Sequence, residues 1–225
     1  MNFKELSIQC RTYRRFSQKP VDPAILQELM ENVRIVSSAM NSQVLRYILV
    51  KDPALVKKLQ PAIHWAAALP KELGTPKEGE QPTAFILVCK EGRGTPWSDI
   101  DVGIAVRNMA LNACAYGVGS AILGAVEWNR VKDILSVPEN WNPRLLMALG
   151  YPSCESHIVD VPENGSIKYF LDENKNYCVP KRALNDICLV KSDGAAERPG
   201  FRRFKRFCPL SAGGFRRWWY RPVGR

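Results

Sequence analysis

Histidine and regularly spaced cysteine are scarce in this sequence, and their scarcity excludes several kinds of active site. The 225 residues include two histidines, His64 and His157, and no His-Glu-x-x-His motif. A zinc site or a histidine-based catalytic triad is therefore disfavoured. The seven cysteines form no Cys-x-x-Cys pair, and their odd number argues against a disulfide framework. We expect reduced thiols and a cytoplasmic location.

Other features of targeting and binding segments are also absent. The first residues lack the apolar stretch of a signal peptide. Gly117-Val-Gly-Ser120 lacks the third glycine and the preceding strand of a dinucleotide-binding fingerprint. Residues 108–126 carry no charge, but they contain Asn108, Asn112 and three glycines, which favours a buried helix and turn over a membrane span. A tightly bound nicotinamide nucleotide is therefore not indicated.

Most of the net charge of +10 lies at the C-terminal end. Residues 191–225 hold ten basic and two acidic residues, a charge of +8, which leaves +2 for residues 1–190. Basic and aromatic residues alternate here, as in Phe201-Arg-Arg-Phe-Lys-Arg-Phe, a pattern that suits nucleic acid or an anionic membrane surface. The abrupt change in composition favours an adventitious or disordered tail. We therefore predict a domain over residues 1–190 and a tail over residues 191–225.

The remaining pattern predicts helices and strands without a regular β-α-β alternation, and so an α+β fold. Asp-Pro pairs at residues 22–23 and 52–53 resemble an N-cap followed by a proline in the first helical turn. Helices are predicted over 23–34, 53–59 and 128–135, strands over 45–50, 84–89 and 144–149, and a hairpin-like pair over 167–171 and 177–179.

A long central helix is predicted to follow Ser98, where Ser98 and Asp101 have the spacing of a capping box. Apolar residues lie at helical spacing on one face, and Ile104, Leu111 and Ala115 make the opposite face apolar as well. We expect Gly117 to end the helix and the helix to be buried all round, in a core or a subunit interface. Cys114 in this helix has only Arg107 as a basic neighbour and is interpreted as inert packing.

The densest cluster of candidate binding residues is Arg11-Thr12-Tyr13-Arg14-Arg15-Phe16. Guanidinium groups bind phosphate oxygens bidentately, and a hydroxyl adds another donor, so the cluster suits a phosphate monoester. Taken alone, however, the segment favours a solvated basic turn over a phosphate site. Its function is therefore decided by the motifs that accompany it.

Five motifs in order resemble the nitroreductase family. Arg-Thr-x-Arg-x-Phe resembles that family's Arg-Ser-x-Arg-x-Phe start, and Ser38-x-x-Asn41-x-Gln43 resembles its Ser-x-x-Asn-x-Gln segment. The others are the central helix from Asp101 with the turn at Leu123-Gly124, the strand end Leu149-Gly-Tyr-Pro152, and Lys181-Arg182. The resemblance implies a central, mostly antiparallel sheet flanked by helices, with the long buried helix at a dimer interface.

The same resemblance implies roles for matching residues of this chain. Arg11, Thr12, Arg14 and Arg182 would bind the phosphate of FMN. Ser38, Asn41 and Gln43 would reach the flavin of the neighbouring subunit, and backbone amides at Leu123 and Gly124 would approach its ring system. The match departs from the family at Cys10, where a second arginine is frequent, and at Val44-Leu45, where the family has Pro-Trp.

The resemblance implies a homodimeric FMN-dependent oxidoreductase that transfers electrons from NAD(P)H to an electron-poor small molecule by a ping-pong mechanism. No side chain is assigned as an acid or nucleophile, and no metal site is expected. Two alternatives remain open. One is a nucleic-acid or membrane-surface binding protein that acts through the basic tail, and the other is the same fold in a flavin-handling or oxidase role.

Overall fold

The computed structural model describes residues 2–66, 69–162, 165–192 and 195–197, and the chain forms two compact units, Met1–Lys181 and Arg182–Arg225. The first unit contains the following helices and strands: α1 Phe3–Gln9, α2 Pro23–Arg34, η1 Ala39–Asn41, β1 Leu45–Val50, α3 Pro53–Leu59, η2 Gln60–Ala62, α4 Lys71–Gly74, β2 Ala84–Glu91, α5 Ser98–Ala115, β3 Gly119–Leu123, α6 Trp128–Leu135, β4 Trp141–Gly150, β5 Ser156–Asp160, β6 Phe170–Leu171 and β7 Tyr177–Lys181.

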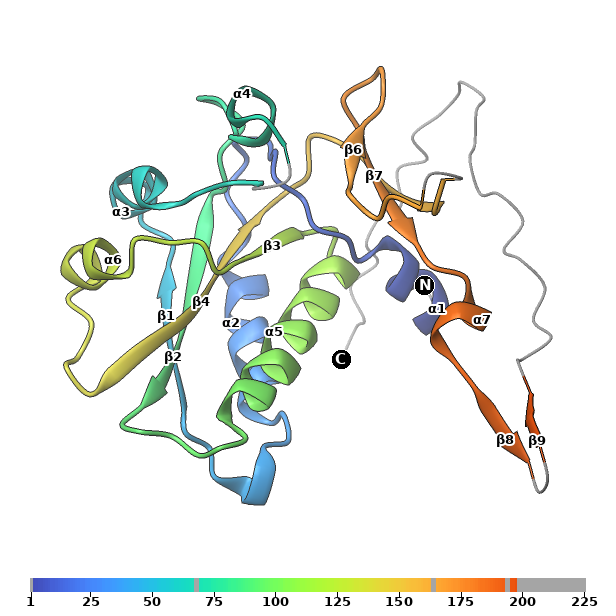
Figure 1. The fold of residues 1–225 in the computed structure, drawn as a ribbon. Helices are drawn as coiled ribbons and strands as arrows, with labels where there is room; N and C mark the ends of the chain where they lie inside the picture. The colour runs from blue at the N-terminus through green and yellow to red at the C-terminus, as the bar shows by residue number, and fades with distance from the viewer. Residues whose placement is uncertain (1, 67–68, 163–164, 193–194, 198–225) are drawn as a thin grey trace, which may run out of the picture. The chain divides into compact units, whose positions relative to one another are not determined.

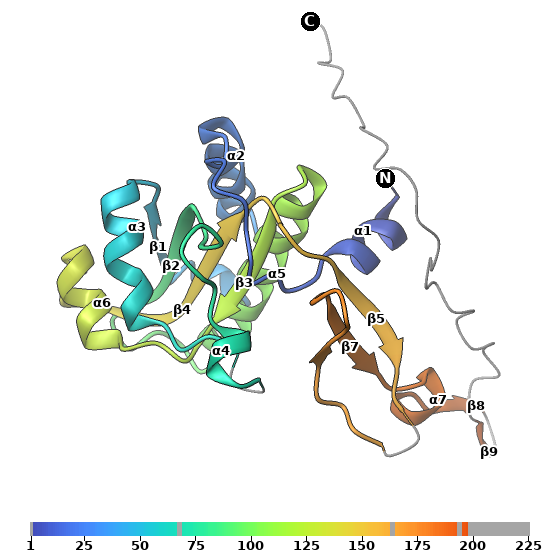
Figure 2. The ribbon, with the colours of Figure 1, turned by 90° about the horizontal axis from the view of Figure 1, so that it is seen from above.

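The main sheet has four strands in the order β1-β2-β4-β3, and all neighbouring pairs are antiparallel. β2 is buried on both faces, since every residue from Ala84 to Cys89 is buried. Ile86 and Val88 pack against α2 and α5, while Phe85 and Leu87 belong to a second core with residues of α3 and α6. Figures 1 and 2 show these two helix pairs on opposite faces of the sheet. The predicted α+β fold with a mostly antiparallel central sheet is confirmed.

Helix α2 and helix α3 begin as the sequence predicts. The Asp22 carboxylate accepts a hydrogen bond from the Ala24 N–H, and the Asp52 carboxylate accepts one from the Leu55 N–H. Each helix then has proline in its first turn, where a missing N–H costs no intrahelical bond.

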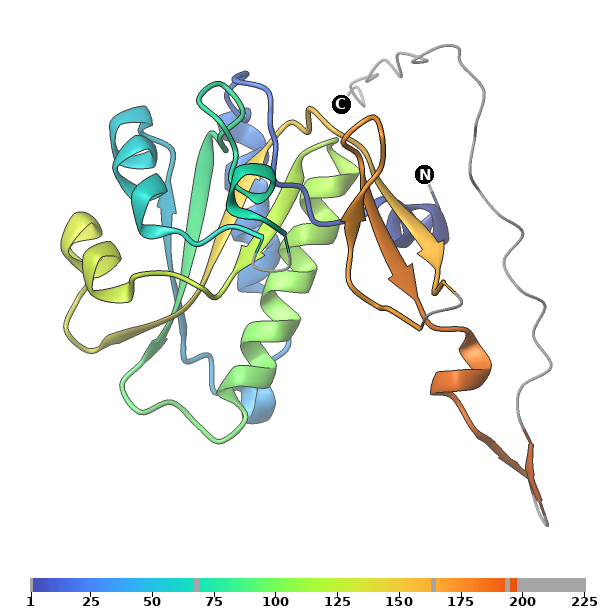
Figure 3. The ribbon, with the colours of Figure 1, turned by 45° about the horizontal axis from the view of Figure 1, so that its top comes forward.

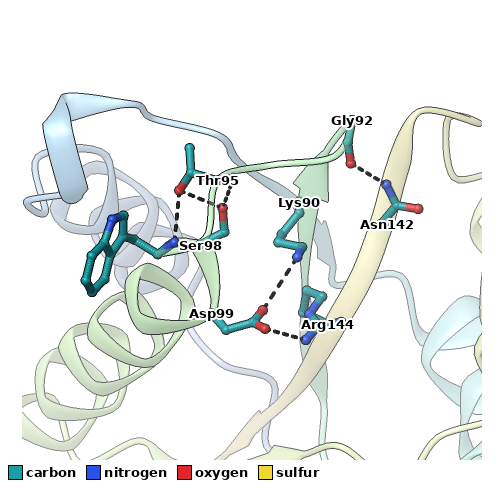
Figure 4. A network of polar contacts seen from close by, with 8 residues as sticks. Lys90, Gly92, Thr95, Ser98, Asp99, Asn142 and Arg144 are labelled. Atoms are coloured by element: carbon teal, nitrogen blue, oxygen red, sulfur yellow. Dashed lines mark hydrogen bonds and ion pairs between the residues drawn. The ribbon is translucent and has the colours of Figure 1, made fainter.

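The N-terminus of α5 differs from the prediction. Trp97 is the N-cap and makes no side-chain cap bond, so the Ser98–Asp101 capping box is wrong. The Ser98 hydroxyl instead accepts the N–H of Thr95 at 2.7 Å. Asp99 joins the first turn of α5 to the sheet, through ion pairs with Lys90 at 3.7 Å and Arg144 at 2.9 Å (Figure 4). The helix start is therefore held by a loop and by two strands.

Helix α5 runs along one face of the sheet beside α2 (Figure 3). It ends before Gly117, whose φ of +72° is a left-handed conformation that favours glycine. Within a single chain α5 is not buried all round, because Ile100 and Ile104 are 54% and 41% exposed, so the expected burial of this face in a subunit interface stays a prediction. One face of α5 is core, and the other face of this helix is a partly apolar surface.

A second sheet has the order β5-β7-β6. β6 pairs antiparallel with β7, which confirms the predicted hairpin-like pair, whereas β5, which pairs parallel to β7, was not predicted from the sequence. In the second unit, α7 Leu184–Ile187 precedes β8 Val190–Ser192 and β9 Ala195–Glu197, which pair antiparallel.

The aromatic and basic motifs of the predicted tail, over residues 201–221, lie outside the described residues. None of the helices in the described ranges is long and apolar enough to cross a membrane.

Candidate phosphate-binding site

The arginine segment follows α1 and runs along the free edge of β3. Tyr13 N–H donates to the Ser120 carbonyl at 2.9 Å, and Thr12 forms an isolated parallel bridge with Ser120. β3 is the last strand of the sheet, with β4 on its other side. Main-chain hydrogen bonding therefore fixes the position of the segment against an otherwise unpaired strand edge.

Phe16 anchors the end of this segment. Its side chain is fully buried, and its N–H donates to the carbonyl of Glu80 at 2.9 Å. Gly150 at the end of β4 makes room for the ring, since a Cβ at this position would lie 2.8 Å from Phe16 Cδ1. The phenylalanine of the first motif and the glycine of Leu149-Gly-Tyr-Pro152 are thus packed against each other, although they are distant in sequence.

A pocket of about 210 Å³ opens beside this segment. Four cationic side chains line it, from the arginine segment, α5 and β7, together with two hydroxyl-bearing residues and a tyrosine. The lining residues are Cys10, Arg11, Thr12, Arg14, Arg107, Ala110, Ser120, Ile122, Tyr169, Val179 and Lys181. Among these described residues there is no carboxylate, so the pocket is strongly positive and suits an anion.

Arg11 has a buried and incompletely paired guanidinium. Its Nη2 donates to the Ser7 carbonyl at 2.5 Å, and its Nε is buried without a partner in the described structure. Burial lowers the pKa of Arg11, and the nearby charge of Arg107 lowers it further, against the opposing effect of Cys10. An anion in the pocket would offset both effects, because it supplies an acceptor and a negative charge.

The two other arginines of the segment differ in position. Arg14 lines the pocket and lies over the rings of Tyr169, at 4.6 Å from the centroid, and Tyr177, at 5.2 Å. Arg15 does not line the pocket. It lies over Tyr177 at 5.6 Å and donates to the Lys175 carbonyl. Stacking on aromatic rings fixes a guanidinium plane while leaving its N–H groups free to bind an anion.

The predicted turn at Leu123 and Gly124 lies at the end of β3. Ser120 and Ile122 line the pocket, while the Leu123 side chain is 7% exposed and belongs to the core on the opposite face. This alternation is that of an ordinary strand. Leu123 can therefore face a ligand only through its backbone, and Gly124, which is exposed, presents no side chain at all.

The predicted Ser38, Asn41 and Gln43 segment is not at this pocket within one chain. Ser38 and Gln43 line a second pocket of about 270 Å³, which Asp101 and Tyr47 also line. Asn41 and Gln43 have φ values of +51° and +47°, and the Ser38 hydroxyl accepts the N–H of Gln43 at 3.2 Å. Their predicted action at a neighbouring subunit's flavin stays a prediction.

Asp101 supports the loop that carries Ser38 and Gln43. Its carboxylate is 2% exposed and accepts the Ala39 N–H at 2.9 Å, and its Oδ2 has no hydrogen-bond partner within the described structure. Burial, followed by the negative charge of Asp101, raises the pKa of Tyr47 to about 12. The carboxylate that was predicted to cap a helix therefore joins α5 to this loop.

Of the Lys181-Arg182 element, Lys181 lines the first pocket. Arg182, the predicted phosphate ligand, is exposed and is the first residue of the second unit. Its assignment as a phosphate ligand stays a prediction.

Four polar residues of the pocket were not predicted as site residues from the sequence, namely Arg107, Ser120, Tyr169 and Lys181. One signal was present, since Arg107 is the last charged residue of α5 and has no other charge after it until Glu127. A cation at the start of a long uncharged stretch marks a polar surface that the helix faces. Lys181 lies in the Lys181-Arg182 motif but was given no role, and Ser120 and Tyr169 carry no pattern that singles them out before folding.

Comparisons with known proteins identify the family of this chain. The nitroreductase family model matches residues 9–151. An NADH dehydrogenase from Thermus thermophilus is 26% identical over 185 residues, which cover 70% of this chain and 90% of that protein. An NADPH-dependent oxidoreductase from Staphylococcus epidermidis is 27% identical over 186 residues, covering 73% of this chain and 67% of that protein.

Solved structures show the same fold. A nitroreductase family protein from Clostridium difficile 630 has a TM-score of 0.57 and 24% identity, covering 68% of this chain and 86% of that chain. An FMN-dependent nitroreductase from Clostridium difficile R20291 has a TM-score of 0.55 and 16% identity, covering 65% and 86% of the two chains.

Proposed function

Because this chain belongs to the nitroreductase family, we propose that it is an FMN-dependent oxidoreductase that transfers electrons from NAD(P)H to an electron-poor small molecule. A nitro compound or a quinone is the class of acceptor that we propose. The observation that carries this proposal is the first pocket, where Arg11, Arg14, Arg107 and Lys181 converge. A phosphate monoester is the anion that such a set of charged donors binds well.

The residues of the pocket fit the phosphate end of FMN. The unpartnered Nε of Arg11 needs an acceptor, and the hydroxyls of Thr12 and Ser120 add neutral donors. Ile122 provides an apolar surface that leads along β3 to Leu123 and Gly124. A ligand with an anionic end and a flat aromatic ring fits a positive pocket that is followed by an apolar surface.

FMN, when bound, supplies the hydride-accepting and hydride-donating chemistry of the reaction. The chain's own residues hold and orient it. Arg11 and Arg14 would hold the phosphate, and stacking on Tyr169 and Tyr177 would keep Arg14 oriented. The exposed backbone at Gly124 would approach the ring closely and offer a donor to charge that develops on it. No side chain of the pocket is needed as an acid, base or nucleophile.

We further propose that the enzyme is a homodimer with a flavin site shared between subunits. Two features of the single chain support this. The arginine segment and the Ser38–Gln43 loop line two different pockets, so one chain does not bring them together. Ile100, Gly103 and Ile104 form an exposed stripe at helical spacing on α5, and a second copy would cover it.

We propose a ping-pong mechanism, in which NAD(P)H and the electron-poor acceptor would bind in turn at one place beside Gly124. The relatives named NADH dehydrogenase and NADPH-dependent oxidoreductase support a nicotinamide reductant of either kind.

The test is the FMN affinity of two neighbouring arginine variants. Arg14→Gln removes a pocket guanidinium, so FMN binding should weaken by roughly 1.5–3 kcal/mol, about ten- to 150-fold in Kd. Arg15→Gln is the matched control, because Arg15 also lies over Tyr177 but does not line the pocket. Its Kd should stay within about twofold of the parent's, because this variant removes no donor from the pocket. Equal loss in both variants, or none in Arg14→Gln, would remove Arg14 from the site.

A further inference from the structure

Cys10 lines the positive pocket and contributes a thiol to its wall. It is the C-terminal cap of α1 and is 5% exposed, and it lines the pocket beside Arg11. Arg107 Nη1 on α5 donates a hydrogen bond to Cys10 Sγ at 3.2 Å. A guanidinium that donates to sulfur favours the thiolate over the thiol.

A second cysteine, Cys114, lies on α5 two turns after Arg107. It lies on the same face of α5 as Arg107, seven residues later, and packs against the core that contains Cys10. Its side chain, through a hydrogen bond, is the main cause that lowers the pKa of Cys10 to about 6, and the charges of Arg107 and Arg11 lower it further against the effect of burial. The pKa of Cys114 is raised, chiefly by the same bond. Cys10 is therefore the sulfur of the pair that loses its proton first.

Two of the other cysteines, Cys89 and Cys154, lie in the opposite kind of environment. Cys89 is fully buried in the second core, and burial raises its pKa to about 11. Burial also raises the pKa of Cys154, against the opposing effect of Arg15. These two thiols are internal controls for reactivity within the same molecule.

We propose that Cys10 and Cys114 form a peroxide-reactive thiol pair, in which Cys10 is the nucleophile and Cys114 resolves it to an intramolecular disulfide. The Cys10 thiolate attacks one oxygen of hydrogen peroxide, an S–O bond forms, the O–O bond breaks, and the leaving hydroxide takes a proton to become water. The Cys114 sulfur then attacks the Cys10 sulfur, an S–S bond forms and a second water leaves with the sulfenic oxygen. The two sulfurs lose two electrons, and the peroxide gains them.

A disulfide between these sulfurs would change the pocket. Cys10 directly precedes Arg11, so a bond from Cys10 to Cys114 would pull on the start of the arginine segment. It would also remove the sulfur anion that Arg107 binds. Oxidation would thus alter the anion pocket, whichever anion the pocket binds, and the thiol chemistry itself does not depend on the proposed cofactor.

The main experiment uses the full chain after reduction and removal of the reductant. It is treated with hydrogen peroxide at pH 7, its remaining thiols are alkylated, and its peptides are analysed by mass spectrometry. We expect a peptide pair joined through Cys10 and Cys114 within one chain, while Cys89 and Cys154 remain thiols. Oxidation of Cys154 as fast as Cys10, or a disulfide that joins two chains through Cys10, would overturn the proposal.

Two variants separate the roles of the sulfurs. In Cys114→Ser, the Cys10 sulfenic acid should persist and be trapped by dimedone, whereas in Cys10→Ser, Cys114 should not be oxidised. Dimedone labelling of Cys114 in the second variant at the rate of Cys10 in the first would contradict the assignment of the nucleophile.

A measurement on the unsubstituted chain avoids dependence on those variants. The rate of Cys10 alkylation by iodoacetamide should rise with pH around a midpoint near 6, as its pKa indicates. The groups that set this midpoint are Arg11 beside it and Arg107 and Cys114 on α5. Arg107→Gln should move the midpoint upward, and the first pH unit of this shift lowers the thiolate fraction at pH 6 roughly fivefold. Arg130→Gln, on α6, is the control that loses an equal charge elsewhere. A midpoint above pH 8 in the unsubstituted chain would overturn the proposal.

Discussion

The absence of a side chain at Gly124 is not required by the fold, but it would be required by a bound flavin. A Cβ at this position would lie 3.7 Å from Leu145 Cδ2, which is an ordinary contact, so the fold itself has room for a methyl group. A ring that approaches the backbone at van der Waals distance would have no such room. The two requirements can therefore be measured separately at one residue.

We predict that Gly124→Ala keeps its thermal stability within a few degrees of the parent chain but binds FMN at least roughly tenfold more weakly, because the methyl group displaces the ring. Thermal unfolding and FMN titration check the two parts. Gly150→Ala is the opposite control, since its Cβ would clash with the buried Phe16 and should lower stability instead. Unchanged FMN binding by Gly124→Ala would place the ring elsewhere.

At the level of single residues, the sequence predicts what is contiguous. Arg11, Thr12 and Arg14 could be identified because they lie within one short motif, and the structure places all three in one pocket. Arg107 and Lys181 come from α5 and β7, and only folding brings them to the same place. Cys114 was interpreted as inert packing because Arg107 is its only basic neighbour in the helix, and the influence of Cys10, 104 positions away in the chain, arises only on folding.

Secondary-structure elements with local signals were predicted closely. α2 and α3 have their signals in the chain itself, an aspartate cap followed by proline, and both start where these signals lie. Asp101 shows the limit of such reasoning. Its spacing from Ser98 indicates a capping box, but its carboxylate instead accepts the N–H of Ala39, which lies 62 residues earlier. Asp101 therefore bonds to a residue distant in sequence rather than to a local one, and the sequence pattern does not indicate this partner.

The burial of Tyr47 near Asp101 leads us to predict that the stability of the fold depends on pH in the alkaline range. Burial first, and the Asp101 charge second, raise the pKa of Tyr47 to about 12, against 10 for a tyrosine in the unfolded chain. As the pH rises, the unfolded chain loses the Tyr47 proton before the folded chain does. The contribution of Tyr47 to the free energy of unfolding is therefore complete below pH 10 and is lost as the pH rises from 10 to 12. Stability should fall over this window.

The Tyr47 titration can be isolated as the difference in phenolate absorbance between the parent chain and Tyr47→Phe. We expect a midpoint near 12 in the difference curve and a shallower loss of stability above pH 10 in the variant. A midpoint near 10 would mean that Tyr47 is neither buried nor close to the carboxylate.

At the scale of the whole molecule, the exposed stripe on α5 predicts self-association. Ile104 is 41% exposed, and a Cβ added at Gly103 would meet no atom from outside the helix within 4 Å, so a partner helix could approach closely there. Ile104→Glu should weaken dimerisation by roughly a hundredfold or more, because a carboxylate would be buried without a partner. Leu73→Glu on α4, where the leucine is 50% exposed, is the matched control and should remain dimeric.

Sedimentation velocity distinguishes these outcomes. A parent chain that sediments as a monomer, or an Ile104→Glu variant that dimerises as well as Leu73→Glu, would contradict the shared flavin site.

The family match and the sheet topology identify the fold of this chain. The central claim is that its positive pocket binds FMN. The most direct measurement is the absorption spectrum of the purified full chain after incubation with FMN and removal of free flavin, followed by anaerobic addition of NADH or NADPH. We expect a yellow protein with stoichiometric FMN that bleaches when the nicotinamide is added. A colourless protein that takes up no FMN would contradict the proposed function.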